Sequence, residues 1–166
     1  MKSRRWFLTG IAAIMATPAR AEAWRRYRND RFGTSIEYPE RFRPGRPPAN
    51  GDGLGFASAD GASFSVWGGH NALEHNVQGL ERFVRDNLPG GAKVVYAARG
   101  ANWFAITGVD GDSIFYERRV ISHAGQIVNG FSIRYPGALK TPYDPVVERM
   151  SKSLRAGRGD DTEGAP

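Results

Sequence analysis

The sequence has no cysteine among its 166 residues and only three histidines. Without thiols the chain forms no disulfide, thiolate zinc site, iron–sulfur cluster or covalent haem, and it has no cysteine nucleophile. The sequence also contains no Gly-x-Ser-x-Gly elbow and no glycine-rich nucleotide fingerprint. Because no nucleophile, base and orienting acid stand out together, we assign no catalytic residue and no cofactor.

A long hydrophobic run is also missing. The most apolar stretch, residues 7–16, is about half of the roughly 20 residues that a membrane-spanning helix needs. Basic residues precede this stretch, and a proline and two small-residue sites follow it. This order is typical of a secretory signal peptide. We therefore predict a leader over residues 1–23, cleaved after Ala21 or Ala23, and a soluble mature protein that does not span a membrane.

The start of the leader has a more specific pattern. Residues 3–9 read Ser-Arg-Arg-Trp-Phe-Leu-Thr and resemble the twin-arginine export signal, from which only Thr9 departs. The resemblance implies a prokaryotic source and export in the folded state, to a periplasm. The alternative is an ordinary secretory signal that happens to contain two adjacent arginines.

The charge of the mature chain is modest. Removing residues 1–23 takes away four positive charges and one negative charge, which lowers the formal net charge from +6 to +3. The remaining positive charge is concentrated near the new N-terminus, where we predict a candidate binding patch for an acidic protein, lipid headgroups or a polyanion. A solvated surface is the alternative, and nucleic acid is not expected as a partner of an exported protein. The patch consists of Arg25, Arg26, Arg28 and Arg31.

Alternation of apolar and polar residues predicts a mostly antiparallel sheet. The Asp60-Gly61 pair suits a two-residue hairpin turn, and Gly68-Gly69 is expected to end that hairpin. Residues 39–53 contain four prolines and no alternation, and are expected to be a surface loop held by Phe42. Two hairpins and a four-stranded meander follow from the predicted strands, which are residues 24–28, 34–38, 54–59, 62–67, 93–98, 103–109, 113–122 and 126–135.

Two amphipathic helices are expected to cover this sheet. The first follows Gly69, with Glu81 among the polar residues that point outward, and its inward face consists of Val77, Leu80, Phe83, Val84 and Leu88. The second is capped by Asp144 with Pro145 as its first residue, and its apolar stripe is Val146, Val147, Met150 and Leu154. The sequence thus predicts one α+β domain over residues 24–155, followed by a disordered tail over residues 156–166 that is rich in glycine and charge.

Several short segments carry a family resemblance: residues 27–33, 36–39 and 50–53, Phe56, and the pair Phe115-Tyr116. Together with the closing helix they resemble a group of small exported bacterial proteins of uncharacterised function. The order of elements resembles the PsbP-like fold, which extrinsic subunits of photosystem II share with a small Ran-binding protein. The resemblance covers residues 24–155 and implies an accessory or binding domain without a catalytic centre, although a fold does not determine function.

Two segments of the sequence contain residues that could bind a metal ion. The Asn50-Gly51-Asp52-Gly53 segment begins like an EF-hand loop, but Gly61 stands where the bidentate glutamate is required. A zinc or copper site, or a hydrolase centre, would have to use the segment that holds His70, Glu74 and His75, with Asp52 nearby. The five-residue spacing of the two histidines does not align them on one helix face, so this remains the alternative to a binding domain.

The aromatic residues suggest a ligand groove if the sheet curves, because binding clefts combine apolar walls with a few polar groups. Its candidate residues are Trp67, Trp103, Tyr116, Arg118 and Arg134. We therefore predict a monomeric, periplasmic and non-catalytic domain that binds a protein partner or another envelope component.

Overall fold

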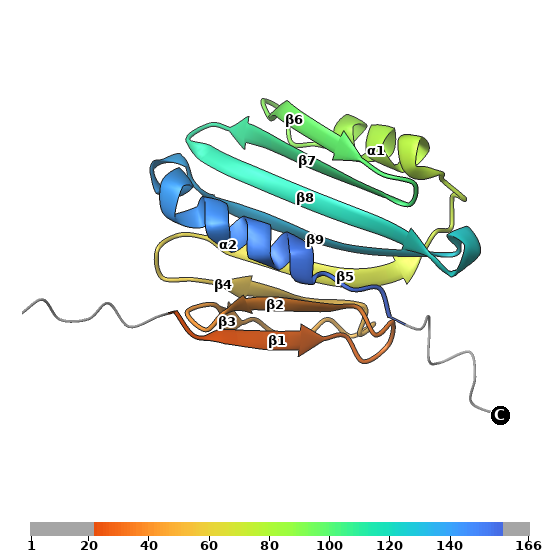
Figure 1. Cartoon of the computed structure of the whole chain (residues 1–166), viewed down its shortest axis with the longest axis horizontal. Helices are drawn as coiled ribbons and strands as arrows, with labels where there is room; N and C mark the ends of the chain where they lie inside the picture. The colour runs from red at the N-terminus through yellow and green to blue at the C-terminus, as the bar shows by residue number, and fades with distance from the viewer. Residues whose placement is uncertain (1–21, 158–166) are drawn as a thin grey trace, which may run out of the picture.

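The computed structural model describes residues 22–157, which form a seven-stranded antiparallel sheet, a separate two-stranded sheet and two α-helices (Figure 1). The large sheet has the strand order β3-β4-β5-β9-β8-β7-β6, and β1 pairs with β2. The strands are β1 Trp24–Arg28, β2 Ser35–Pro39, β3 Arg43–Pro44, β4 Gly53–Ala57, β5 Ser63–His70, β6 Lys93–Arg99, β7 Trp103–Asp110, β8 Ser113–Ser122 and β9 Ile127–Pro136. The helices are α1 Val77–Asp86 and α2 Lys140–Ser153, and two short 3-10 turns span His123–Gly125 and Gly137–Leu139.

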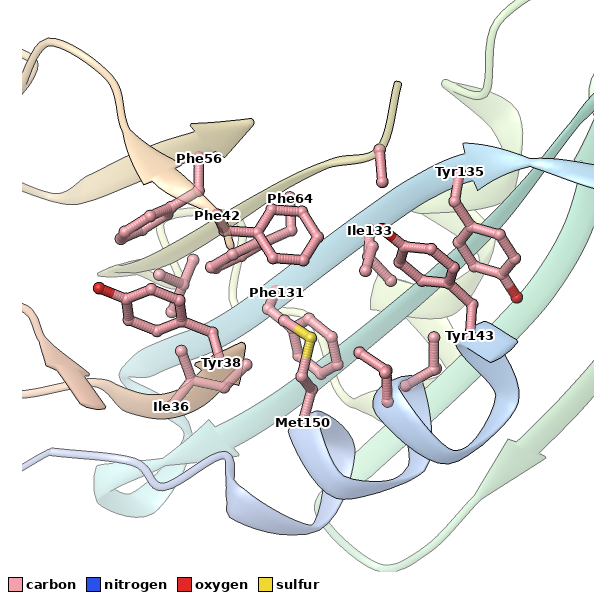
Figure 2. Close-up of a cluster of buried hydrophobic side chains, with 14 of the residues drawn as sticks. Ile36, Tyr38, Phe42, Phe56, Phe64, Phe131, Ile133, Tyr135, Tyr143 and Met150 are labelled. Atoms are coloured by element: carbon pink, nitrogen blue, oxygen red, sulfur yellow. The ribbon is translucent and has the colours of Figure 1, made fainter. Parts of the chain in front are cut away.

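One face of the sheet, called here the front face, carries the larger core. Helix α2 and the β1–β2 pair lie over this face, and Met150 of α2 points at Phe131 of β9 (Figure 2). The rings of Phe56 and Phe64 are stacked with their centroids 4.4 Å apart, and Phe42 meets Phe64 edge-on at 5.0 Å. Tyr38 of β2 packs on Phe56 and Phe64, and Tyr143 of α2 stacks on Tyr135 of β9, so aromatic contacts hold both elements on the sheet.

The opposite face, called here the rear face, carries a smaller core. Leu80 and Val84 of α1 pack against apolar side chains of β7, β8 and β9, among them Phe104, Ile106 and Phe115. Helix α1 lies behind the sheet near β6 and β7, whereas α2 lies in front of β8 and β9 (Figure 1). Among the described residues, no helix lies over the rear face of β4 or over Ser63 and Ser65 of β5.

The meander β6–β9 and the apolar stripe of the second helix are confirmed, and so is Phe42 as the buried residue of its loop, with 1% of its surface exposed. In the first helix Leu80 and Val84 are buried as predicted, but Phe83, predicted on the same face, is exposed. The strand after Asp60-Gly61 was predicted too short. The pairing with β4 stops at Trp67, as expected, but β5 continues through Gly68-Gly69 to His70 because β9 pairs with it there.

Several other local predictions were wrong. The β4–β5 connection contains residues 58–62 instead of two residues, and residues 39–53 include the short strand β3. Helix α2 begins at Lys140, five residues before Pro145, because the 3-10 turn before it starts the helix earlier. Asp144 consequently pairs with Lys140 at 2.7 Å and does not cap the helix.

The prediction for Glu81 was also wrong, because this residue is buried rather than outward-pointing. The predicted leader, apart from Glu22 and Ala23, and the tail from residue 158 lie outside the described residues. Within the part of the chain that is described, no helix is long and apolar enough to cross a membrane.

Candidate functional site

The predicted aromatic groove does not exist as one site, because its residues lie on both faces of the sheet. Successive side chains of a strand point to opposite faces, and the strand register places Trp67 and Arg134 on the rear face. Trp103, Tyr116 and Arg118 lie on the front face beside α2. There the Arg118 guanidinium lies 4.5 Å from the Trp103 ring centre and donates to Ser151 Oγ at 3.1 Å.

The rear face is hollowed along β5 and β9 into a groove with α1 as one wall. Three adjoining hollows, of about 250, 470 and 280 Å³, follow one another over this face. Small residues make the floor low: Ser63 and Ser65 of β5 stand next to Ala57 and Gly55 of β4, and Ser132 of β9 is opposite Ser65. We call this surface the rear groove. Its wall consists of Leu80 and Phe83 of α1 with Leu88 and Pro89, which follow α1, and its other residues are Arg43, Arg46, Ser63, Ser65, Trp67, Arg119, Ser132 and Arg134.

Trp67 lies on the floor of the rear groove because its neighbour on β9 has no side chain. A Cβ atom at Gly130 would lie 2.7 Å from Trp67 Cζ2, so only glycine leaves room for the indole there. The Arg119 guanidinium lies 5.5 Å from the indole centre, and Arg119 Nε donates to Glu117 Oε1 at 2.6 Å. The indole is thus held between the sheet and a fixed cation.

One end of the rear groove is apolar. Leu80, Phe83 and Trp67 line the hollow there, and Leu73 and Phe83 expose 64% and 41% of their surface. Exposed large apolar side chains beside a hollow mark a binding surface more often than isolated ones do. The segment that carries Leu73 is fixed by Asn71, whose Nδ2 donates to the His75 carbonyl at 2.9 Å and to the Gly125 carbonyl at 2.8 Å.

The other end is cationic. Arg43 and Arg46 at the edge strand β3 are exposed, and neither has an ion pair or a hydrogen-bonded side-chain partner among residues 22–157. Arg134, which is partly exposed, pairs with Asp110 at 2.6 Å. The charged residues that line the three hollows are four arginines and one glutamate: Arg43, Arg46, Arg119, Arg134 and Glu117. Serine hydroxyls and guanidinium groups of this kind suit hydrogen bonds and ion pairs with an anionic ligand.

The predicted arginine patch lies on and next to β1, away from the rear groove, and acidic neighbours neutralise part of it. Arg25 pairs with Glu40, whose hydrogen bond raises the Arg25 pKa. Arg26 pairs with Glu37 at 3.0 Å, and hydrogen bonds from Arg26 and Arg149 lower the Glu37 pKa. The two remaining patch residues differ: Arg28 is exposed, whereas Arg31 donates to the Asn50 carbonyl at 3.3 Å.

The predicted metal residues do not converge. His70 packs edge-on against Phe32 with ring centres 5.4 Å apart, and the His75 ring lies 5.5 Å from that of Phe83. Glu74 is exposed with a positive φ of 50°, and Asp52 accepts a hydrogen bond from Asn50 at 2.7 Å. Across residues 22–157, no group of three histidine, aspartate or glutamate side chains is placed to hold a metal ion.

Sequence reasoning missed most of the rear groove. The serines at alternate positions of β5 carry a signal, because they mark the strand's exposed face. Only the pairing of β5 with β9, in which Ser63 lies opposite Arg134, 71 residues later in the chain, brings Ser132 and Arg134 to the same floor. That long-range pairing is not readable from local patterns.

Comparisons with known proteins address the fold. No protein-family model and no curated protein sequence matches the chain. The solution structure of cyanobacterial PsbP (CyanoP) from Synechocystis sp. PCC 6803 matches with a TM-score of 0.60 and 13% identity, covering 84% of this chain and 96% of that one. The crystal structure of the Saccharomyces cerevisiae Ran-binding protein Mog1p matches with a TM-score of 0.58 and 8% identity, covering 82% and 96%. The predicted α+β class is therefore confirmed, and the chain has a PsbP-like fold similar to those of CyanoP and Mog1p.

Proposed function

We propose that this protein is exported to a bacterial periplasm and acts there as a non-catalytic binding domain for a protein partner. The observation that carries the proposal is the rear groove, which has exposed apolar side chains at one end and, at the other end, two arginines with no side-chain partner among the described residues. A protein partner suits this combination better than another envelope component, because protein interfaces pair an apolar centre with a polar rim.

Two further observations support the proposal. The twin-arginine pattern of residues 3–9 favours export in the folded state. Mog1p, which has a similar fold, is described as a Ran-binding protein. This similarity supports protein binding as a role by analogy of fold alone.

Export is tested with the full chain carrying a C-terminal tag in a bacterial host that has the twin-arginine pathway. We expect the protein in the periplasmic fraction, with an N-terminus at Glu22 or Trp24. A variant with Arg4→Lys and Arg5→Lys should stay in the cytoplasm with its leader intact. Cytoplasmic location of the unaltered chain contradicts this part of the proposal, and export of both forms indicates an ordinary secretory signal.

Binding is tested by placing a photo-crosslinking amino acid at Ser65, on the floor of the rear groove. The matched control position is Thr141, which is exposed on α2. Crosslinking in living cells should give an adduct of defined mass at Ser65 and none at Thr141. Equal adducts at both positions, or none at Ser65, contradict a partner at the rear groove.

A further inference from the structure

Positive charge predominates in the rear groove, and two of its arginines have no side-chain partner among residues 22–157. Arg119 and Arg134 are paired with Glu117 and Asp110, respectively. Arg43 and Arg46 have neither an ion pair nor a hydrogen bond from their side chains within the described part of the chain. Guanidinium groups bind carboxylates in bidentate geometry, so this end of the groove is complementary to acidic side chains.

The arginine end and the apolar end lie at a defined distance. Arg43 is in register with Ala57, and Ala57 with Ser63, so these three residues form one row across the sheet. Trp67 lies four residues further along β5, which at roughly 3.4 Å per residue is about 14 Å, and Arg43 lies two strands to the side of β5, which at roughly 4.8 Å per strand is about 10 Å. The two ends are thus about 17 Å apart, which an extended peptide covers with about five residues. The floor between the two ends carries Ser65, which has a small side chain, and Gly55, which has none, so there is room for a main chain.

We infer that the rear groove binds an extended acidic peptide segment of the partner protein, with its carboxylates on Arg43 and Arg46 and one large apolar side chain between Trp67, Leu73 and Phe83. The inference rests on the proposed function and names the chemistry of its partner. The hydroxyls of Ser65 and Ser132 hydrogen-bond the polar groups of the peptide between the two ends.

The apolar end distinguishes this occupant from other anions. A polysaccharide or a phosphate-rich surface needs the arginines but has no large apolar side chain for the hollow lined by Leu80 and Phe83. The hollow also lies beside α1 on a recessed floor. A flat lipid surface contacts the outermost side chains first and would not reach this floor. A peptide with both acidic and apolar residues uses the whole length of the groove.

The experiment screens the mature chain, residues 22–166, against a phage library of random 12-residue peptides. The enriched peptides should carry at least two acidic residues and a large apolar residue four or five positions away. A synthetic peptide of the enriched sequence is then titrated by fluorescence anisotropy at about 0.15 M salt, near physiological ionic strength. We expect Arg43→Glu with Arg46→Glu to weaken binding at least tenfold, and Leu73→Asp to weaken it at least fivefold.

The control carries the same change of charge elsewhere. Arg82 and Lys93 are exposed, lie outside the hollows and have no side-chain partner among the residues described. Arg82→Glu with Lys93→Glu should change the affinity less than twofold. A peptide with lysine in place of its acidic residues should bind the Arg43→Glu, Arg46→Glu variant better than it binds the unaltered protein, which a misfolded variant could not show.

Several outcomes overturn the inference. The first is a library that enriches no peptide, or only peptides without acidic residues. The second is peptide binding that Arg43→Glu with Arg46→Glu and Arg82→Glu with Lys93→Glu weaken equally. The third is a peptide affinity that Leu73→Asp leaves unchanged. Binding of anionic phosphatidylglycerol vesicles or dextran sulfate that depends on Arg43 and Arg46, without peptide binding, assigns the groove to a polyanion instead. If crosslinking at Ser65 still yields a partner while the peptide test fails, the proposed function stands and only the peptide chemistry is wrong.

Discussion

Asp60, in the connection between β4 and β5, joins that connection to α2. Its carboxylate accepts a hydrogen bond from Tyr143 Oη at 2.7 Å, and Arg41 Nε lies 3.8 Å from Oδ2. Burial opposes ionisation of Asp60, but hydrogen bonds from Tyr143, the Ala62 N–H and Ser58, with the charge of Arg41, outweigh it and lower the Asp60 pKa. A carboxyl group with a lowered pKa stabilises the fold above its unfolded-state pKa, and this contribution is lost as the pH falls through the folded-state value.

We therefore expect Asp60→Asn to lower the free energy of unfolding by about 1 kcal/mol at pH 7, a modest value because the side chain is partly exposed. The difference from the unaltered protein should stay constant above about pH 5 and shrink below about pH 4, where the carboxyl becomes protonated. Urea denaturation between pH 2 and pH 7 measures it. Asp112→Asn, in an exposed turn, is the control and should change stability little at any pH; a pH-independent effect of Asp60→Asn would contradict the role of its charge.

At the scale of elements, α1 is tied to the edge strand β6 by a buried carboxylate. Glu81 accepts two hydrogen bonds from Arg85, at 2.9 and 2.8 Å, and its second oxygen lies 3.0 Å from Arg99 Nη2. Only 4% of the Glu81 side chain is exposed. Removing one member of such a cluster leaves the others without a partner in a poorly solvated place.

Glu81→Gln, which keeps the shape and removes the charge, should lower the free energy of unfolding by about 1–2 kcal/mol. Glu148→Gln removes a carboxylate from the exposed pair with Lys152 and should cost less than about 0.5 kcal/mol. Denaturant unfolding measures the free energy of unfolding of both variants. Hydrogen exchange of the β6 amides should be faster in Glu81→Gln and unchanged in Glu148→Gln. Equal stability of both variants would show that burial of Glu81 adds nothing to its ion pairs.

Elements made by local contacts were predictable, and elements made by distant ones were not. The strands β6 to β9 follow one another with short turns, so alternation and turn residues sufficed for the meander. The burial of Glu81 depends on Arg99, which helical periodicity does not contain. The extension of β5 depends on β9, and the position of Arg43 beside Ser63 depends on β3 joining the sheet edge, so the rear groove could not be assembled from the sequence.

At the scale of the whole molecule, the end of the described chain closes the fold on its beginning. The Arg155 N–H donates to the Ser35 carbonyl at 2.9 Å, and the Ser35 N–H donates to the Arg155 carbonyl at 3.0 Å. Leu154 is buried in the front core, and Ser153 Oγ accepts from the Glu37 N–H at 2.9 Å. These contacts hold β2 against α2.

A chain that ends at Lys152 should therefore lose about 3–5 kcal/mol of stability, from the buried leucine and the lost backbone hydrogen bonds. A chain that ends at Gly157 keeps all of these contacts and is the control. Thermal unfolding followed by circular dichroism should give a melting temperature at least 10 °C lower for the shorter chain, given the few degrees per kcal/mol of a domain this size. Equal melting temperatures would show that β2 is held by the β1–β2 pair alone.

This closure sets the order of events during synthesis. Ser35 of the second strand is synthesised 120 residues before its partner Arg155. Until Arg155 has emerged from the ribosome, the N-terminal hairpin has no last turn of α2 to lie against, and the nascent polypeptide stays open to chaperones and proteases. Any route that carries this protein across a membrane in its native form must therefore act after Arg155 has been synthesised and paired.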